Sequence, residues 1–425
     1  MYSNPFNSQL EEAIRKKFAF VDFDPHYGPR LFFDNSGGSL RLSSSVTERY
    51  TLDLLPDCPE RYHARANDFN QLMDSTREEI LSTVLGAKSG SIITELTASQ
   101  VFFNVVSVIL ENCQGTNVVT TNVEHPSAYD SLKMYAEKND LDFRVAEANK
   151  ETGFVDPESV AELVDDGTIV VSVISASNIS GNIMDIKTIG KECKKKNSNI
   201  FFISDAVQHL PHGLVDVEDM DLDFLNFAPY KFFASRGLGI GYASERLSQL
   251  THHKLNGKDS SIWELGSPAP AVFKSFLEVI DYVCWIGEHF INSRNRRELY
   301  IEGITKIAEK ERYLLNLLLE GDAEIEGLRS MSGAKAFVDY ADLTRRDLIV
   351  AMEIEGLDHT EAVARYQEKG VTVYERVNTS IYSKRIVESL GLTGAIRVSP
   401  LHVHTKDDIR QFLLITKDLI HQVQK

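Results

Sequence analysis

The sequence of 425 residues has only four cysteines, Cys58, Cys113, Cys193 and Cys284. They lie far apart and form neither a CxxC pair nor a Cys/His spacing typical of metal ligands. A structural zinc site and a disulfide framework are therefore not expected, and we predict no metal site. Unpaired thiols are typical of a reducing compartment, so we expect a cytoplasmic protein.

Long apolar runs and an excess of positive charge are also lacking. No stretch approaches the roughly 18 apolar residues of a membrane span, and residues 1–17 mix acidic and basic side chains, unlike a signal peptide. Lysine and arginine total 45 against 62 aspartate and glutamate residues, a net charge of −17. We expect no membrane and no nucleic acid as partner, although a local basic pocket for a small anion is compatible with this charge.

The remaining composition is that of a folded globular protein, with 43% hydrophobic and 25% charged residues. Short β-branched runs alternate with helix-length segments, which predicts crossover connections and a mainly parallel sheet in an α/β fold. We expect seven strands in this large sheet, at residues 91–94, 117–121, 142–145, 168–175, 200–204, 224–227 and 239–243.

The order of these patterns predicts three segments. Residues 1–44, a helix followed by an extended run, should pack on the small domain and on the functional site. Residues 45–290 should form the large domain and residues 291–425 a small α+β C-terminal domain. Further elements are expected as a helical stretch at 269–319, strands at 334–340 and 371–374, and helices at 358–369 and 406–424.

Two polar side chains follow apolar strands of the predicted sheet. Asp205 ends the run 201–204, and Lys231 follows the strand 224–227. Ligands gather at the carboxyl ends of such strands, so a carboxylate and an amine should converge on one crevice. A lysine beside apolar neighbours can have a lowered pKa and attack a carbonyl group. A surface lysine and a strand-capping aspartate would explain the same spacing.

The order and spacing around these residues resemble fold-type I enzymes that depend on pyridoxal 5′-phosphate, specifically the class V aminotransferase and cysteine desulfurase family. The family has an Asp-Ala-x-Gln strand end, then Asp-Phe and a lysine after an aromatic residue, as here in Asp205, Gln208, Asp223 and Lys231. The resemblance runs from residue 32 to 412. It implies the fold of a fold-type I PLP-dependent transferase.

Within this resemblance, the cofactor contacts can be assigned residue by residue. Lys231 should hold pyridoxal phosphate as an internal aldimine, Asp205 should pair with the ring nitrogen, and Gln208 should contact the phenolic oxygen. An ionised Asp205 keeps that nitrogen protonated, so that the ring can accept electrons from the substrate's Cα. His125 resembles the histidine that stacks on the ring, although Ala128 replaces the asparagine that usually follows it.

The phosphate side of the predicted site departs from the desulfurase pattern. The segment of Thr97, Ala98 and Ser99 resembles the turn whose amides hold the phosphate at a helix N-terminus. In the family motif Ser-x-His-Lys, however, this chain has Ala228 and Tyr230. Tyr230 keeps a hydroxyl donor, and Ala228 has none.

The resemblance also implies a substrate side and a partner. Arg397 begins an Arg-x-Ser motif whose arginine binds the substrate α-carboxylate, a task that suits the planar guanidinium. Ser267 resembles the residue that the neighbouring subunit contributes to the phosphate, which implies a homodimer with shared active sites. Further predicted substrate-binding residues are Asn178, which also lies near the cofactor, Asn35, Arg376 and Thr379.

The absence of a cysteine near the Arg-x-Ser motif limits the reactions that we expect. Cysteine desulfurases need a nucleophilic cysteine shortly before the Arg-x-Ser motif, and here Thr379 stands in that stretch while no cysteine lies beyond Cys284. A hydroxyl is a far weaker sulfur acceptor than a thiolate. We therefore expect the protein to belong to the branch of C–S lyases and isopenicillin-N epimerase relatives. Within this branch, β-elimination on an amino acid is slightly favoured over transamination. Epimerisation and a non-catalytic binding descendant are the remaining alternatives.

Overall fold

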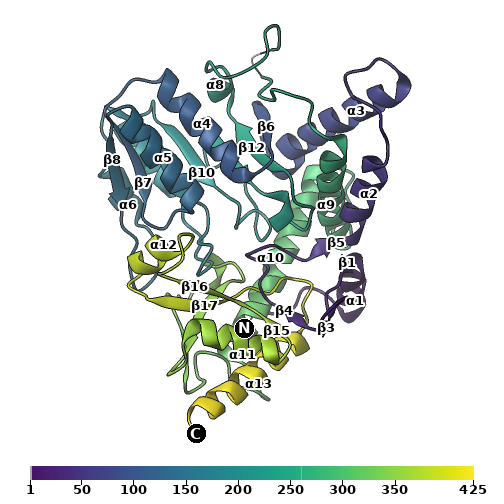
Figure 1. The fold of residues 1–425 in the computed structure, drawn as a ribbon, viewed down its shortest axis with the longest axis vertical. Coiled ribbons are helices and arrows are strands. Elements are labelled where there is room, and N and C mark those ends of the chain that lie inside the picture. The colour runs from purple at the N-terminus through teal and green to yellow at the C-terminus, as the bar shows by residue number, and fades with distance from the viewer. Residues whose placement is uncertain (1, 260) are drawn as a thin grey trace.

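A seven-stranded sheet, made of β6 to β12, forms the centre of the larger part of the molecule (Figure 1). The computed structural model describes residues 2–259 and 261–425. Within the sheet β9, β10, β11, β7 and β8 pair in parallel, and β12 pairs antiparallel with β11 and β6. The order is β6 (Ser91–Glu95), β12 (Gly239–Ala243), β11 (Phe224–Phe227), β10 (Phe201–Asp205), β9 (Thr168–Ile174), β7 (Asn117–Thr121) and β8 (Asp142–Ala146). The predicted mainly parallel seven-stranded sheet is confirmed.

Helices cover both faces of this sheet. Because side chains on both sides of each strand are buried, the strand sequences are continuous apolar runs. In β10, Phe201 and Ile203 pack in one cluster, whereas Phe202 packs in another on the opposite face. The first cluster includes side chains of α4 (Ala98–Asn112) and α5 (Pro126–Lys138). The second includes side chains of α7 (Ile186–Lys196) and α9 (Pro270–Glu288).

The helical stretch predicted at 269–319 consists of two helices, separated by a short loop. α9 ends at Glu288, and α10 (Arg296–Glu320) begins after a loop in which Asn295 caps the new helix by accepting the N–H of Glu298. The two helices pack on each other. A Cβ on Gly303 would lie 1.9 Å from the carbonyl oxygen of Val283, so the close crossing requires glycine there.

The smaller part contains an antiparallel sheet in the order β13 (Ala334–Ala336), β14 (Val350–Ile354), β17 (Gly394–Val398) and β16 (Tyr374–Val377). Strands β14 and β17 were not among the predicted ones, and the strand predicted at 334–340 is only three residues long. The predicted helices correspond to α11 (His359–Glu368) and α13 (Lys406–Val423). The domain boundary predicted at residue 290 lies in the loop between α9 and α10.

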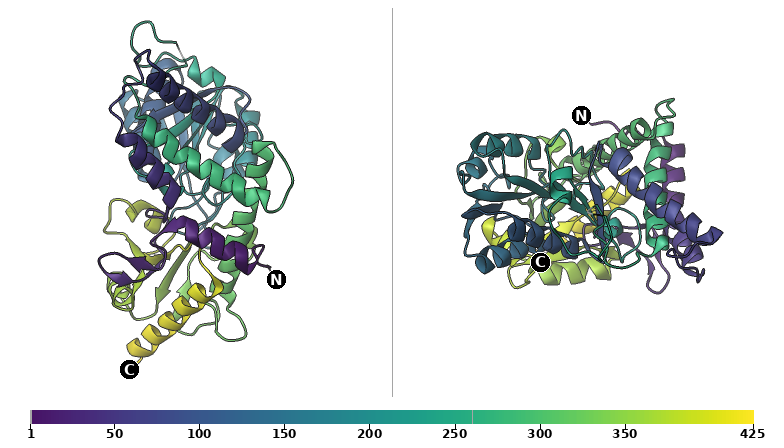
Figure 2. Two further views of the ribbon diagram at one scale, coloured as in Figure 1. Left: turned by 90° about the vertical axis from the view of Figure 1, so that its right-hand side faces the viewer. Right: turned by 90° about the horizontal axis from the view of Figure 1, so that it is seen from above.

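The N-terminal segment is joined to the smaller part by main-chain pairing. β4 (Leu31–Phe32) pairs in parallel with β15 (Val371–Thr372), and Phe33 lies in the core of the smaller part. Figure 2 shows this purple segment running alongside both parts of the molecule, with α1 (Ser8–Lys17) between them. The turn after β4 consequently lies where the two parts meet.

The remaining elements are short or peripheral. They are β1 (Phe18–Ala19), β2 (Phe23–Asp24), β3 (Gly28–Pro29), β5 (Arg41–Leu42), α2 (Ser43–Asp53), α3 (Ala64–Glu79), the π-helical turn η1 (Ile80–Val84), α6 (Pro157–Ala161), the 3₁₀ turn η2 (Pro229–Lys231), α8 (Glu245–Ser248), the 3₁₀ turn η3 (Leu343–Arg345) and α12 (Lys384–Ser389). Among the described residues, no helix combines the length and apolar character needed to cross a membrane.

Candidate active site

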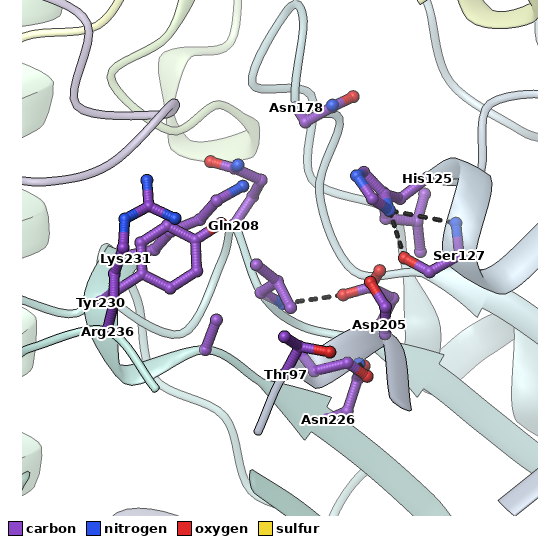
Figure 3. A pocket seen from close by; sticks show the side chains of 15 residues that line it. Thr97, His125, Ser127, Asn178, Asp205, Gln208, Asn226, Tyr230, Lys231 and Arg236 are labelled. Carbon is purple, nitrogen blue, oxygen red and sulfur yellow. Dashed lines mark hydrogen bonds between the residues drawn. The ribbon is translucent and has the colours of Figure 1, made fainter. Parts of the chain in front are cut away.

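A cavity opens where β9, β10 and β11 end and α4 begins. It encloses about 690 Å³ of space, part of it open to solvent. Figure 3 shows its polar side chains converging from several elements. The lining residues are Thr97, Ala98, Ser99, His125, Ser127, Ile174, Asn178, Asp205, Val207, Gln208, Asn226, Ala228, Tyr230, Lys231 and Arg236.

Asp205 is the last residue of β10 and is buried. Its Oδ1 accepts the N–H of Val207 at 3.0 Å. Burial raises the pKa of this carboxyl to about 6, while the hydrogen bond and the charge of Lys231 act in the opposite direction. The side chain is therefore ionised at neutral pH and presents a buried negative charge to a ligand.

Lys231 enters the cavity opposite Asp205 from the turn η2, which follows β11 (Figure 3). The residue lines the cavity and is half-buried. Burial lowers the pKa of Lys231 to about 7, and the charge of Arg397 adds to this effect. A large fraction of the Lys231 amine is thus neutral at physiological pH, and the neutral amine can attack a carbonyl group or accept a proton.

His125 caps α5 at the edge of the cavity. Its Nδ1 accepts the N–H of Ser127 at 3.2 Å and also bonds the Ser127 hydroxyl. Burial, and next the charge of Lys231, lower the pKa of His125 to about 3. The imidazole is therefore neutral, and its flat ring is held in place by the helix cap rather than by a counter-ion.

The N-terminus of α4 supplies free amide groups to the cavity. Thr97 is the N-cap and its hydroxyl accepts the N–H of Gln100 at 3.2 Å. The amides of Ala98 and Ser99 lie in the first turn, where no intrahelical acceptor exists, so they can bind an anion. Asn226 of β11 supports this turn by donating to the carbonyl oxygen of Ala98 at 3.1 Å.

Two arginines on strands of the smaller part act electrostatically on Lys231, although neither lines the cavity. Arg397 of β17 is 2% exposed, donates to the carbonyl oxygen of Asn178 at 3.1 Å and pairs with Asp34 at 2.7 Å. Arg376 of β16 is also buried and donates to the carbonyl oxygen of Tyr382 at 2.8 Å. Burial, and next the charge of Arg397, lower the pKa of Arg376 to about 10.

The comparisons with known proteins agree with this geometry. The family model described as Aminotransferase class-V matches residues 32–412. The chain belongs to the aminotransferase class-V family. A probable cysteine desulfurase of Borreliella burgdorferi is 23% identical to this class-V chain over 98% of each protein. The aminotransferase-like protein FGM3 of Gibberella zeae is 26% identical over 95% of this chain and 96% of the relative.

Solved structures share the class-V fold. The apo cysteine desulfurase of Thermococcus onnurineus NA1 superposes with a TM-score of 0.81 at 20% identity, covering 99% of this chain and all of that one. The cysteine desulfurase CsdA of Escherichia coli superposes with a TM-score of 0.79 at 18% identity, covering 99% of both chains. The predicted fold-type I architecture is confirmed by this likeness.

This class-V protein is a pyridoxal-phosphate-dependent enzyme. The cavity fits that cofactor, because Lys231 can engage its aldehyde, Asp205 its ring nitrogen and the start of α4 its phosphate. The buried Oδ1 of Asn178 has no hydrogen-bond partner within the described residues, and Asn178 lines the cavity, so an acceptor is left free for a ligand. The alternative of a non-catalytic descendant is not supported.

Among the residues predicted to bind the cofactor, Ser267 alone does not line the cavity. It is exposed and lies in a separate surface hollow with Leu96 and Leu265. Gln208 lies in the cavity and donates to the carbonyl oxygen of Ser36 at 3.1 Å. Thr379, predicted to bind substrate, is exposed in the loop after β16 and does not line the cavity.

The side chain of Asn35, which we predicted to bind substrate, does not line the cavity and makes hydrogen bonds within the protein. Its amide nitrogen donates to the carbonyl oxygens of Phe32 and Ser399, and its amide oxygen accepts the N–H of Leu40. Every polar atom of the side chain therefore holds the turn after β4 in place. The neighbouring carboxylate of Asp34, which was not predicted, is the one that reaches Arg397.

Sequence reasoning also missed several lining residues. Ser127 lies two positions after His125, and Asn226 five before Lys231, so an inspection of the residues flanking the motifs could have found both. Arg236 lies five positions after Lys231, but no motif of the sequence marks it as a site residue. Its place on the cavity depends on how the loop after Lys231 folds back over Tyr230.

Proposed function

We propose that this enzyme removes the Cα proton of a small amino acid or a cysteine-derived conjugate and then eliminates the β-substituent. The absence of cysteine from the residues that line the cavity, within the described chain, carries this proposal. Cys193 and Cys284 are buried, and burial raises the pKa of each thiol to about 12. A persulfide-forming thiolate therefore has no support, whereas a β-leaving group needs no thiol acceptor on the enzyme.

Pyridoxal phosphate, when bound, withdraws electrons from the substrate's Cα. The Nζ atom of Lys231 is the group that accepts the Cα proton, and its lowered pKa keeps it largely able to do so at neutral pH. The charge of Asp205 holds a proton at the ring nitrogen. The neutral His125 adds a flat, uncharged face to the cavity.

Arg397 is proposed to hold the substrate carboxylate. Its Nε is buried with no hydrogen-bond partner among the described residues, while another nitrogen already pairs with Asp34. Both Nη atoms already donate, Nη1 to the carbonyl oxygen of Asn178 and Nη2 to Asp34, so a carboxylate bound in a bidentate way through Nε and Nη2 meets Asp34 there. Substrate therefore shares Arg397 with Asp34 or displaces it.

The elimination balances without an external oxidant. The Cα–H bond breaks with its proton passing to Lys231, and the bond from Cβ to the leaving group breaks with its electron pair passing to that group. The leaving thiolate takes up a proton, and the released 2-aminoacrylate reacts with water to give pyruvate and ammonia. Transamination is the second candidate, favoured by the likeness to the aminotransferase-like protein FGM3.

The test incubates the holoenzyme with amino acids and cysteine S-conjugates while the cofactor spectrum and the products are followed together. Catalytic release of pyruvate and thiol without a 2-oxo acid supports elimination. Stoichiometric conversion of the cofactor to its amine form, reversed by a 2-oxo acid, would instead establish an aminotransferase. Inversion of the Cα configuration in deuterated water without either product would establish an epimerase.

A homodimer with shared active sites is also proposed, in which Ser267 reaches the phosphate of the other subunit. The exposed apolar side chains beside it, Leu96 at 68% and Leu265 at 55% exposure, support a contact surface here. Light scattering of the holoenzyme at micromolar concentration should give twice the monomer mass. A monomer with cofactor still bound would contradict this proposal.

A further inference from the structure

Arg236 is a cation on the cavity wall that the proposed reaction does not use. It lies between η2 and β12, and its guanidinium carbon is 4.0 Å from the centre of the Tyr230 ring. Figure 3 shows Arg236 beside Tyr230 and Lys231, across the cavity from Asp205 and His125. Stacking on an aromatic face leaves the N–H edge of a guanidinium free to bind oxygen atoms.

The side chain of Arg236 is exposed, and no group among the described residues compensates its charge. Within residues 2–259 and 261–425, its guanidinium has no hydrogen-bond acceptor and no ion-pair partner. The nearby Arg41 is a second cation that donates to the main-chain oxygens of Ser39 and Tyr230. Burial, and next the charge of Arg236, lower the pKa of Arg41 to about 10. Two neighbouring cations without a carboxylate form a place where an anion is stabilised.

The fold also keeps space for this side chain. A Cβ on Gly38 would lie 3.2 Å from an Nη atom of Arg236, and 3.7 Å from the Tyr230 ring. The glycine of the N-terminal segment thus leaves room for the guanidinium between the turn and the aromatic ring. The position of Arg236 on the cavity therefore depends on two segments that are distant in the sequence.

The expected ligand carries more negative charge than a helix N-terminus can balance. A phosphate monoester brings about two negative charges at neutral pH, and one helix N-terminus is equivalent to only about half a positive charge. Ala228 contributes no donor. Lys231 and Arg236 are the cationic side chains among the lining residues, and Lys231 is needed at the carbonyl carbon.

We propose that Arg236 binds the phosphate of pyridoxal phosphate, together with the start of α4 and the hydroxyl of Tyr230. It thereby supplies the positive charge that Ala228 and Tyr230 do not. This role goes beyond the proposed reaction and holds for elimination, transamination or epimerisation alike. An anionic group on the substrate is the competing ligand for the same guanidinium.

The test compares pyridoxal phosphate with pyridoxal, which lacks the phosphate. Apoenzyme of the wild type and of Arg236→Met, Arg236→Lys and Arg294→Met is titrated with each compound, and binding is read from the absorbance of the cofactor. Arg294 is the matched control, since it is an exposed arginine in the loop between α9 and α10 and does not line the cavity. Far-UV circular dichroism checks that each variant is folded.

Arg236→Met should lower the affinity for pyridoxal phosphate at least tenfold, about 1.4 kcal/mol, and leave the affinity for pyridoxal within twofold of the wild type. The affinity of Arg236→Lys for pyridoxal phosphate should lie between those of the wild type and Arg236→Met. Arg294→Met should bind both compounds as the wild type does. Unchanged affinity for pyridoxal phosphate would overturn the proposal, as would an equal loss for both compounds. A raised KM for acidic amino acids with unchanged cofactor affinity would assign the guanidinium to substrate instead. A wild type that binds neither compound would contradict the cofactor itself.

Discussion

Replacing Glu311 by glutamine should destabilise the protein strongly near neutral pH and hardly at all at high pH. Glu311 lies on α10 and is buried together with two histidines. One oxygen bonds His212 at 2.7 Å, and the other accepts the main-chain N–H of His402 at 3.1 Å. His212 follows the strand end that carries Asp205, and His402 follows Arg397, so one carboxylate connects the two segments that form the site.

The size of this destabilisation follows from the pKa of His212 in its pair with Glu311. Burial opposes the charge of His212, but the charge and hydrogen bond of Glu311 outweigh it and raise the pKa of His212 from 6.5 to about 9. At 1.36 kcal/mol for each pKa unit, the pair stabilises the fold by about 3 kcal/mol. Because the folded pKa is raised, this contribution is present below pH 6.5 and is lost as the pH rises through about 9.

Urea unfolding of the holoenzyme, followed by far-UV circular dichroism under conditions shown to be reversible, measures the effect. Glu311→Gln should be about 3 kcal/mol less stable than the wild type at pH 6.5 and within about 1 kcal/mol at pH 9.5. Groups common to both proteins cancel in this difference. Glu309→Gln is the control on the same helix, since Glu309 pairs with Lys306 near the surface and should change stability by less than about 1 kcal/mol at either pH. A loss from Glu311→Gln that is small at pH 6.5, or equal at both pH values, would refute the reasoning.

Three other predictions concern the cavity. The rate at which apoenzyme takes up pyridoxal phosphate should rise with a midpoint near pH 7, because the neutral form of Lys231 attacks the aldehyde; stopped-flow absorbance measures it, and a midpoint above pH 9 would be inconsistent with the lowered pKa. Arg397→Met should raise KM more than tenfold with cofactor content unchanged, and steady-state kinetics with an unaltered KM would contradict carboxylate binding. Gly239→Ala should lower bound cofactor, measured by absorbance, because its Cβ would lie 2.1 Å from the carbonyl carbon of Thr97, and a cofactor content equal to that of the wild type would exclude this contact.

The predictable part of the site depends on local sequence. Asp205 and Lys231 each follow a buried strand, and parallel strands bring their carboxyl ends to one edge of a sheet, so their convergence needs no knowledge of packing. The small sheet was predicted less well. β14 and β17 are short buried runs whose apolar residues show no strict alternation, and a short apolar run does not by itself distinguish strand from helix.

The sequence by itself predicted the α/β order of elements, the seven-stranded sheet and most of the residues that line the cavity, because periodicity and motif spacing are properties of neighbouring residues. The tertiary structure alone decided which side chains face each other. Asp34 and Arg397 are 363 positions apart, and only the pairing of the N-terminal segment with the smaller part brings them together. Asn35 and Arg236 show the same limit, since the hydrogen bonds of one and the free charge of the other depend on distant segments that no local pattern records.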